Sequence, residues 1–86
     1  MNRKEENGVV YDADNCYGFY NNGQLQMCFL LENYKQDDLE FKSNTRILFK
    51  QDGSVQEGYL AKKYKDFKIG SHIYIDDEGN IVEMPF

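Results

Sequence analysis

RILFKQDGSVQEGYL, residues 46–60, decides the fold because this stretch recurs twice more in the 86-residue chain. The three copies occupy residues 16–30, 46–60 and 72–86, and each is centred on a glycine that follows an acidic or amide residue. Apolar or aromatic residues recur six and four positions before that glycine, and two and seven positions after it. Short apolar stretches around an Asn-Gly or Asp-Gly pair are typical of β-hairpins. The sequence therefore predicts a tandem array of hairpins.

The position of the glycine predicts the type of turn. If Asp52 and Gly53 formed a two-residue turn, Phe49 would pair with Gln56, and each face would mix apolar and polar side chains. A three-residue loop that ends in a left-handed glycine and a G1 bulge pairs Phe49 with Val55 instead. The same register pairs Phe19 with Leu25 and Ile75 with Ile81. We therefore expect bulged turns, with the recurrent apolar positions facing the core.

The repeats cover most of the chain and predict one small all-β domain, residues 1–86. Residues 1–6 are expected to be a disordered tail, and residues 7–13 an N-terminal strand with Val10 two positions after a glycine. The hairpin repeats are expected at residues 15–30, 45–60 and 71–86. Residues 36–40 lengthen the first repeat interval and are interpreted as an insertion in a loop. The predicted fold is an antiparallel meander of about seven strands without a helix.

The turn sequences resemble a known family. FYNNGQL, FKQDGSV and IDDEGNI, at residues 19–25, 49–55 and 75–81, are similar to bacterial tandem hairpin repeats with a Phe-Tyr-x-Asn-Gly-x-Leu consensus, including the YwqK-like antitoxin and MORN-type repeats. The resemblance covers residues 15–86 and implies a binding scaffold rather than a catalyst, with toxin neutralisation as the expected role. The Tyr-x-Gly-x-x-x-x-Gly stretch of standard MORN repeats is absent, so lipid binding is not expected.

The N-terminal residues and the two cysteines indicate in which cellular compartment the protein is expected. Residues 1–7 lack the apolar run of a signal peptide, and no stretch is long enough to span a bilayer, so we expect a cytoplasmic protein without membrane contact. Cys16 and Cys28 lie on opposite arms of the first hairpin, so they could form a disulfide or remain two free thiols. A reducing compartment favours two free thiols.

The sequence does not indicate a catalytic, metal or cofactor site. His72 falls where a strand residue should face solvent, and one histidine without a Cys-x-x-Cys pair argues against metal binding. The paired carboxylates lie in turns, which are wetter than the clefts where acids and bases are tuned. The lysines and aromatics of residues 59–68 resemble a strip for single-stranded nucleic acid, but a pI of about 4.7 suits a polyanion poorly. We expect no enzyme, no cofactor, no metal and no direct nucleic-acid binding.

Charge is the feature that points to a partner. Fifteen acidic residues against ten basic ones give a net charge of −5, and residues 70–86 contain no lysine or arginine. Glu57 and Glu83 share the same repeat position and are expected to lie side by side. The acidic candidates for partner binding are Asp37, Asp38, Glu40, Glu57, Asp76, Asp77, Glu78 and Glu83, with Tyr20 and Tyr74 as aromatic anchors.

An acidic sheet of this kind predicts a small inhibitor. The expected partner is a basic toxin of the nuclease type, because a nuclease must present positive charge to its substrate. The chain would be an immunity protein or antitoxin that covers the active surface, and a phage protein acting on a defence nuclease would use the same physics. The alternative is a self-associating scaffold, a homodimer formed through an open edge at residues 9–11 or 81–86 or through one sheet face.

Overall fold

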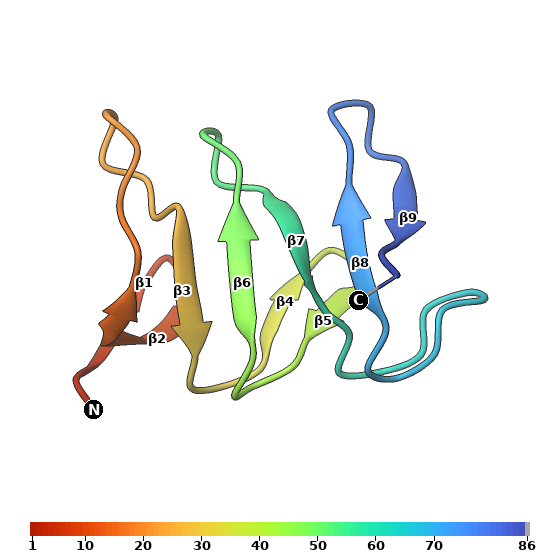
Figure 1. The fold of residues 1–86 in the computed structure, drawn as a ribbon, viewed down its shortest axis with the longest axis horizontal. Helices are drawn as coiled ribbons and strands as arrows, with labels where there is room; N and C mark the ends of the chain where they lie inside the picture. The colour runs from red at the N-terminus through yellow and green to blue at the C-terminus, as the bar shows by residue number, and fades with distance from the viewer. Residues whose placement is uncertain (86) are drawn as a thin grey trace.

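The protein folds into short β-strands, nine in the residues that the structure describes, 1–85, with no helix among them (Figure 1). The structure is a computed structural model. The strands are β1 (Arg3–Glu6), β2 (Val9–Cys16), β3 (Met27–Leu30), β4 (Tyr34–Gln36), β5 (Leu39–Phe41), β6 (Arg46–Phe49), β7 (Val55–Tyr59), β8 (His72–Ile75) and β9 (Ile81–Glu83). Seven form one antiparallel sheet in the order β1-β2-β3-β6-β7-β8-β9, and β4 pairs with β5. The predicted all-β antiparallel meander is confirmed.

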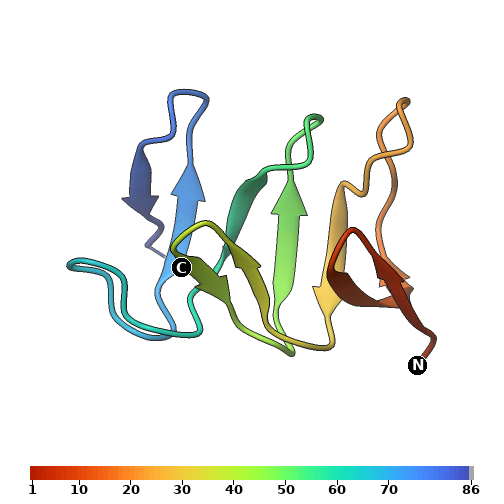
Figure 2. The ribbon, with the colours of Figure 1, turned by 180° about the vertical axis from the view of Figure 1, so that it is seen from behind.

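One face of the seven-stranded sheet carries the core, and the β4–β5 hairpin lies across that face (Figure 2). Phe41 of β5 packs on Gly58 of β7, where an added Cβ would lie 2.6 Å from the Phe41 ring. Because Gly58 has no side chain, the ring rests directly on the backbone of the sheet. The most deeply buried residues around this contact are Leu25, Cys28, Leu30, Phe41, Ile47, Phe49, Val55, Leu60 and Ile73.

The three repeat hairpins close with the turns that the sequence predicts. The expected cross-strand pairs all form: Phe19 with Leu25, Phe49 with Val55 and Ile75 with Ile81. The central glycine of each turn has a left-handed φ, 88° at Gly23, 91° at Gly53 and 84° at Gly79. Its amide donates to the carbonyl three residues earlier, over 2.9 to 3.0 Å. Both features define a type I turn closed by a G1 bulge.

Side chains three positions before the glycine join one hairpin tip to the next. The Tyr20 hydroxyl of the first hairpin donates to the Phe49 carbonyl of the second over 2.8 Å. Lys50, at the same position in the second hairpin, donates from Nζ to the Asp76 carbonyl of the third over 2.6 Å. These bonds hold the tips in a row, as Figure 1 shows along its upper edge.

The insertion at residues 36–40 is not a loop, which corrects the prediction. Gln36 pairs with Leu39, so Asp37 and Asp38 form a two-residue turn between β4 and β5, with Asp37 at a φ of 55°. Leu39 and Phe41 alternate with polar residues and are buried. This period-2 alternation is the strand signal in the insertion. The hairpin is needed because it supplies the second layer of the core.

The N-terminus also differs from the prediction. Residues 1–6 are not a disordered tail, because Arg3–Glu6 form β1 and pair with β2. Asn7 and Gly8, with φ values of 53° and 82°, make the tight two-residue turn between them. Residues 9–11 therefore belong to an inner strand, and the edge of the sheet on this side is β1.

The first hairpin departs from the other two. Tyr17 and Phe19, at positions expected in the core, are 65% and 54% exposed. The cause is an irregularity in β2, where Asp12 pairs with Phe29 but Cys16 pairs with Cys28, so residues 13–15 bulge out. The bulge turns the strand after it outwards. The third copy's last apolar position, residue 86, lies outside the described residues.

The contact between Gly58 and Phe41 gives a stability prediction. Gly58→Ala should lower the free energy of unfolding by about 1–3 kcal/mol, because the new methyl group overpacks the core. Urea denaturation monitored by circular dichroism measures the loss. Phe41→Leu in the same chain relieves the clash, so the double variant should lose less than the two single variants together. Strict additivity would contradict the proposed contact.

The two cysteines give a redox prediction. Cys16 and Cys28 are free thiols on paired strands, with Sγ atoms 2.8 Å apart, and burial raises the pKa of Cys28. Hydrogen peroxide should oxidise both thiols to one intramolecular disulfide and be reduced to two waters. Closing this short loop should stabilise the fold by about 2–3 kcal/mol. Mass spectrometry of the intact chain should show the loss of two hydrogens, and Cys16→Ser should abolish it. Accumulation of sulfinic acid without a disulfide would contradict the prediction.

Candidate functional site

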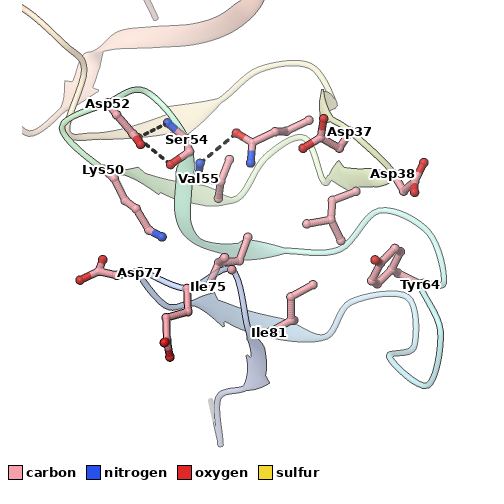
Figure 3. A pocket seen from close by; sticks show the side chains of 14 residues that line it. Asp37, Asp38, Lys50, Asp52, Ser54, Val55, Tyr64, Ile75, Asp77 and Ile81 are labelled. Carbon is pink, nitrogen blue, oxygen red and sulfur yellow. Dashed lines mark hydrogen bonds between the residues drawn. The ribbon is translucent and has the colours of Figure 1, made fainter.

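A cleft lies where the β4–β5 hairpin meets the tips of the second and third repeat hairpins (Figure 3). Its volume is about 460 Å³. Apolar side chains form its floor: Leu39, Val55, Tyr64, Ile75 and Ile81. Carboxylates form its rim: Asp37, Asp38, Asp52, Asp77 and Glu78. We call this feature the acidic cleft.

The wall formed by the β4–β5 hairpin is held by one hydrogen bond to the sheet. The Val55 amide of β7 donates to Oε1 of Gln36 over 2.9 Å. Gln36 is the last residue of β4, so this bond anchors the turn that follows it. Asp37 and Asp38 stand in that turn and are exposed. The insertion thus presents two adjacent carboxylates at a defined place above the floor.

The second hairpin contributes Asp52 and Lys50. Asp52 accepts hydrogen bonds from the Ser54 hydroxyl over 2.6 Å and from the Ser54 amide over 2.9 Å. Both bonds lower the pKa of Asp52, and the bond from the Ser54 hydroxyl contributes most. Lys50 is the one cation among the residues that line the cleft, and its Nζ is bound to the Asp76 carbonyl. The carboxylates therefore outnumber the cations at this site.

In the third hairpin a different residue stabilises the same turn. In the first two copies the side chain before the glycine, Asn22 or Asp52, accepts a hydrogen bond from the amide of the residue that follows the glycine. The third copy has Glu78 there, and Asp76 takes over the role by accepting the amides of Glu78 and Asn80 over 2.9 and 2.8 Å. The bond from the Asn80 amide is the main cause of the lowered pKa of Asp76. Asp76 thus holds the turn, and Asp77 and Glu78 line the cleft.

The structure brings together four of the ten residues predicted to bind a partner. Asp37, Asp38, Asp77 and Glu78 share the cleft although about 40 residues separate the two pairs in sequence. Asp76 lies beside them but is used in its own turn. Glu40 lies outside the cleft lining and accepts a hydrogen bond from Asn33 over 2.9 Å. Sequence reasoning missed Asp52, although it stands in the turn of the second repeat.

The two predicted anchors lie elsewhere. The Tyr20 hydroxyl is occupied by its bond to the Phe49 carbonyl, and Tyr20 lines a shallow hollow beside Lys50 and Gln56. Tyr74 of β8 alternates with the core residues Ile73 and Ile75 and so faces the other side of the sheet. Neither side chain lines the acidic cleft.

The prediction that Glu57 and Glu83 lie side by side is wrong. The register of the second hairpin shifts at Gln56, so Glu57 pairs with Leu48 and not with Ile47. The third hairpin has no such shift, and Glu83 pairs with Ile73. A one-residue bulge reverses the face of every residue beyond it. Glu57 therefore points away from the core, and Glu83 stands on the core side of the edge strand.

Glu57 instead binds His72, which was expected to face solvent and is only 9% exposed. His72 Nε2 and Glu57 Oε2 are 2.7 Å apart, and the imidazole stacks on Tyr59 with the ring centroids 4.3 Å apart. His72 Nδ1 is buried without a hydrogen-bond partner in residues 1–85. Because a carboxylate oxygen accepts hydrogen bonds, His72 donates from Nε2 to Glu57.

Within residues 1–85, no group of three or more histidine, cysteine, aspartate or glutamate side chains is arranged to hold a metal ion. The same residues contain no helix long and apolar enough to cross a bilayer. Comparison with protein-family models, with curated proteins and with solved structures gives no match to this chain.

The turn role of Asp76 gives a pH prediction. The pKa of Asp76 is lower in the folded state than its ordinary value of 3.8, so the ionised carboxylate stabilises the fold at pH values above 3.8. This stabilisation is lost as the pH falls through the folded-state pKa. Asp76→Asn should therefore flatten the fall in Tm between pH 5 and about pH 2.5. Asp77→Asn removes the same charge without touching the turn and serves as the control. Equal pH profiles for the Asp76 variant and the wild type would contradict the assignment.

Proposed function

We propose that this chain is a non-catalytic inhibitor that binds a basic protein through the acidic cleft. In this role it is an immunity protein or antitoxin that covers the nucleic-acid-binding surface of a nuclease-type toxin. No cofactor takes part, since inhibition by occlusion requires only a stable complex.

One observation carries the proposal. Two separate turns, residues 37–38 and 77–78, present their carboxylates around a single apolar floor. Carboxylates around one cleft add up to a negative potential that attracts cations. Lys50 is the one lysine or arginine that lines the cleft, and its Nζ is already bound to the Asp76 carbonyl. The rim therefore favours a positive group supplied from outside.

The floor and the rim together suit an arginine or lysine side chain. The methylene groups of such a side chain can cover Tyr64 and Ile81, the half-buried residues of the floor, while its charged end stays among the carboxylates. Arginine fits best because its planar guanidinium can bind a carboxylate through two parallel hydrogen bonds. A nuclease surface supplies such residues, since it must neutralise phosphates.

The test measures inhibition of purified basic nuclease domains, including any encoded beside this chain's gene. We expect stoichiometric inhibition of at least one of them. A variant with Asp37→Asn, Asp38→Asn, Asp77→Asn and Glu78→Gln should bind that nuclease at least about 100-fold more weakly, because it loses the charged rim. Calorimetric titration gives the dissociation constant, and residual nuclease activity gives the functional readout.

The matched control removes four exposed carboxylates outside the cleft, with Glu5→Gln, Asp14→Asn, Glu32→Gln and Asp66→Asn. It changes the net charge equally and should keep its inhibition. Raising the salt concentration should slow association of the wild type, since electrostatic steering is screened beyond about 10 Å at 0.1 M. Full inhibition by the cleft variant would overturn the site, and failure to inhibit any basic nuclease would overturn the function.

A further inference from the structure

The face of the sheet opposite the core carries an unusual set of side chains. Cross-strand pairing aligns a first row through Met27, Leu48, Glu57, Tyr74 and Val82. Beside this row, Phe29 pairs with Arg46, and Tyr59 pairs with His72, whose carbonyl accepts the Met84 amide. Tyr17, whose amide donates to the Met27 carbonyl, extends the first row. We call this surface the open face.

The open face is apolar where an uncovered sheet should be polar. Antiparallel sheets with one solvated face usually alternate apolar residues inside with polar residues outside. Here eight outward positions carry large apolar or aromatic side chains: Tyr17, Met27, Phe29, Leu48, Tyr59, Tyr74, Val82 and Met84. None of the eight is buried, and Tyr17 and Val82 are 65% and 53% exposed. The other six are half-buried, so this face is an uncovered apolar surface, the kind that marks an interaction site.

The described part of the chain does not cover this face. The β4–β5 hairpin, which could act as a second layer, lies on the other side, where Phe41 rests on Gly58. Glu57 and Tyr59 flank Gly58 in β7 and therefore point away from that hairpin. Figure 1 shows β6, β7 and β8 unobstructed from the front, and Figure 2, seen from the opposite side, shows the hairpin in front of the sheet.

Charge indicates which partner fits. The chain has a net charge of −5, so two copies repel one another over most of their surfaces. The centre of the open face is the exception, because its formal charges are one exposed cation, Arg46, and one carboxylate, Glu57. Arg46 makes no ion pair with any residue in 1–85, and Glu57 uses Oε2 for His72. The face is thus apolar, neutral at its centre and complementary to itself.

We propose that a second copy of the chain covers the open face, forming a symmetric dimer with the two sheets packed face to face. The molecule measures 34 Å by 25 Å in the plane of the sheet, which bounds the face at roughly 850 Å². A standard stable interface buries about 800 Å² on each partner. The rectangle that encloses the molecule thus has about the area of one side of a standard interface, and the acidic cleft on the other side remains accessible.

The register places the symmetry axis. Arg46 and Glu57 are diagonal neighbours on β6 and β7, and a two-fold axis midway between them sets each Arg46 over the Glu57 of the other copy. Leu48 pairs with Glu57 and stands two positions from Arg46 on the same face of β6, so it is a neighbour of both and lies close to this axis. Each Leu48 then packs against Leu48 of the second copy, at the centre of the interface.

The experiment uses this self-contact. Wild-type protein should sediment at twice the 10.1 kDa chain mass, whereas Leu48→Glu and Leu48→Lys should each sediment as monomers, because each places two like charges at the axis. An equimolar mixture of the two variants should recover a dimer, since the opposite charges then meet. A folding defect cannot produce that recovery, and circular dichroism checks the fold of each variant.

Arg46→Glu should weaken the dimer by on the order of tenfold or more, because it sets a carboxylate over Glu57. Lys68→Glu makes the same charge change at an exposed position in the β7–β8 connection and should leave the dimer intact. A wild-type monomer at roughly 100 µM, well above the dissociation constants of standard interfaces, would overturn the proposal. Dimers formed by both Leu48 variants alone, or two monomers that stay apart on mixing, would overturn the assigned axis.

Discussion

The left-handed glycine that closes each type I turn is the constraint on which the rest of the molecule depends. It sets one register in all three repeat hairpins, so that the apolar residue four positions before the glycine meets the one two positions after it. Shifting this register by one residue would expose those pairs, because side chains alternate between faces. The turns also stand in a row, since Tyr20 and Lys50 each bind the backbone of the next hairpin. Local turn chemistry thus determines both the strands and their stacking.

The second layer of the core comes from the insertion that interrupts the repeat. A meander of hairpins alone would leave both sheet faces open, and the β4–β5 hairpin covers only one. Gly58 allows the close approach of Phe41, and Gln36 ties the end of β4 to Val55. The same hairpin brings Asp37 and Asp38 beside the third turn. The β4–β5 hairpin therefore both completes the core and creates the acidic cleft.

The two surfaces proposed to bind partners lie on opposite sides of the sheet and differ in chemistry. The acidic cleft has an apolar floor with a charged rim, which suits a basic protein. The open face is apolar with one cation and one carboxylate at its centre, which suits a second copy. Glu57 and Tyr74, which the sequence groups with the acidic cluster, belong to the open face. A dimer joined there would present two clefts, one on each outer side.

The amino-acid sequence by itself determined the hairpins, their turn type and the apolar pair next to each turn, because these depend on residues within one hairpin. It also placed Asp37, Asp38, Asp77 and Glu78 among eight acidic candidates, since composition and repeat position are local properties. Only the tertiary structure decided that these four residues meet, because the insertion folds back across the sheet. It alone separated Glu57 from Glu83 and buried His72, since one bulge at Gln56 reverses the faces of the residues beyond it. Such shifts depend on how neighbouring strands pack, and a repeat pattern read along one chain does not contain that information.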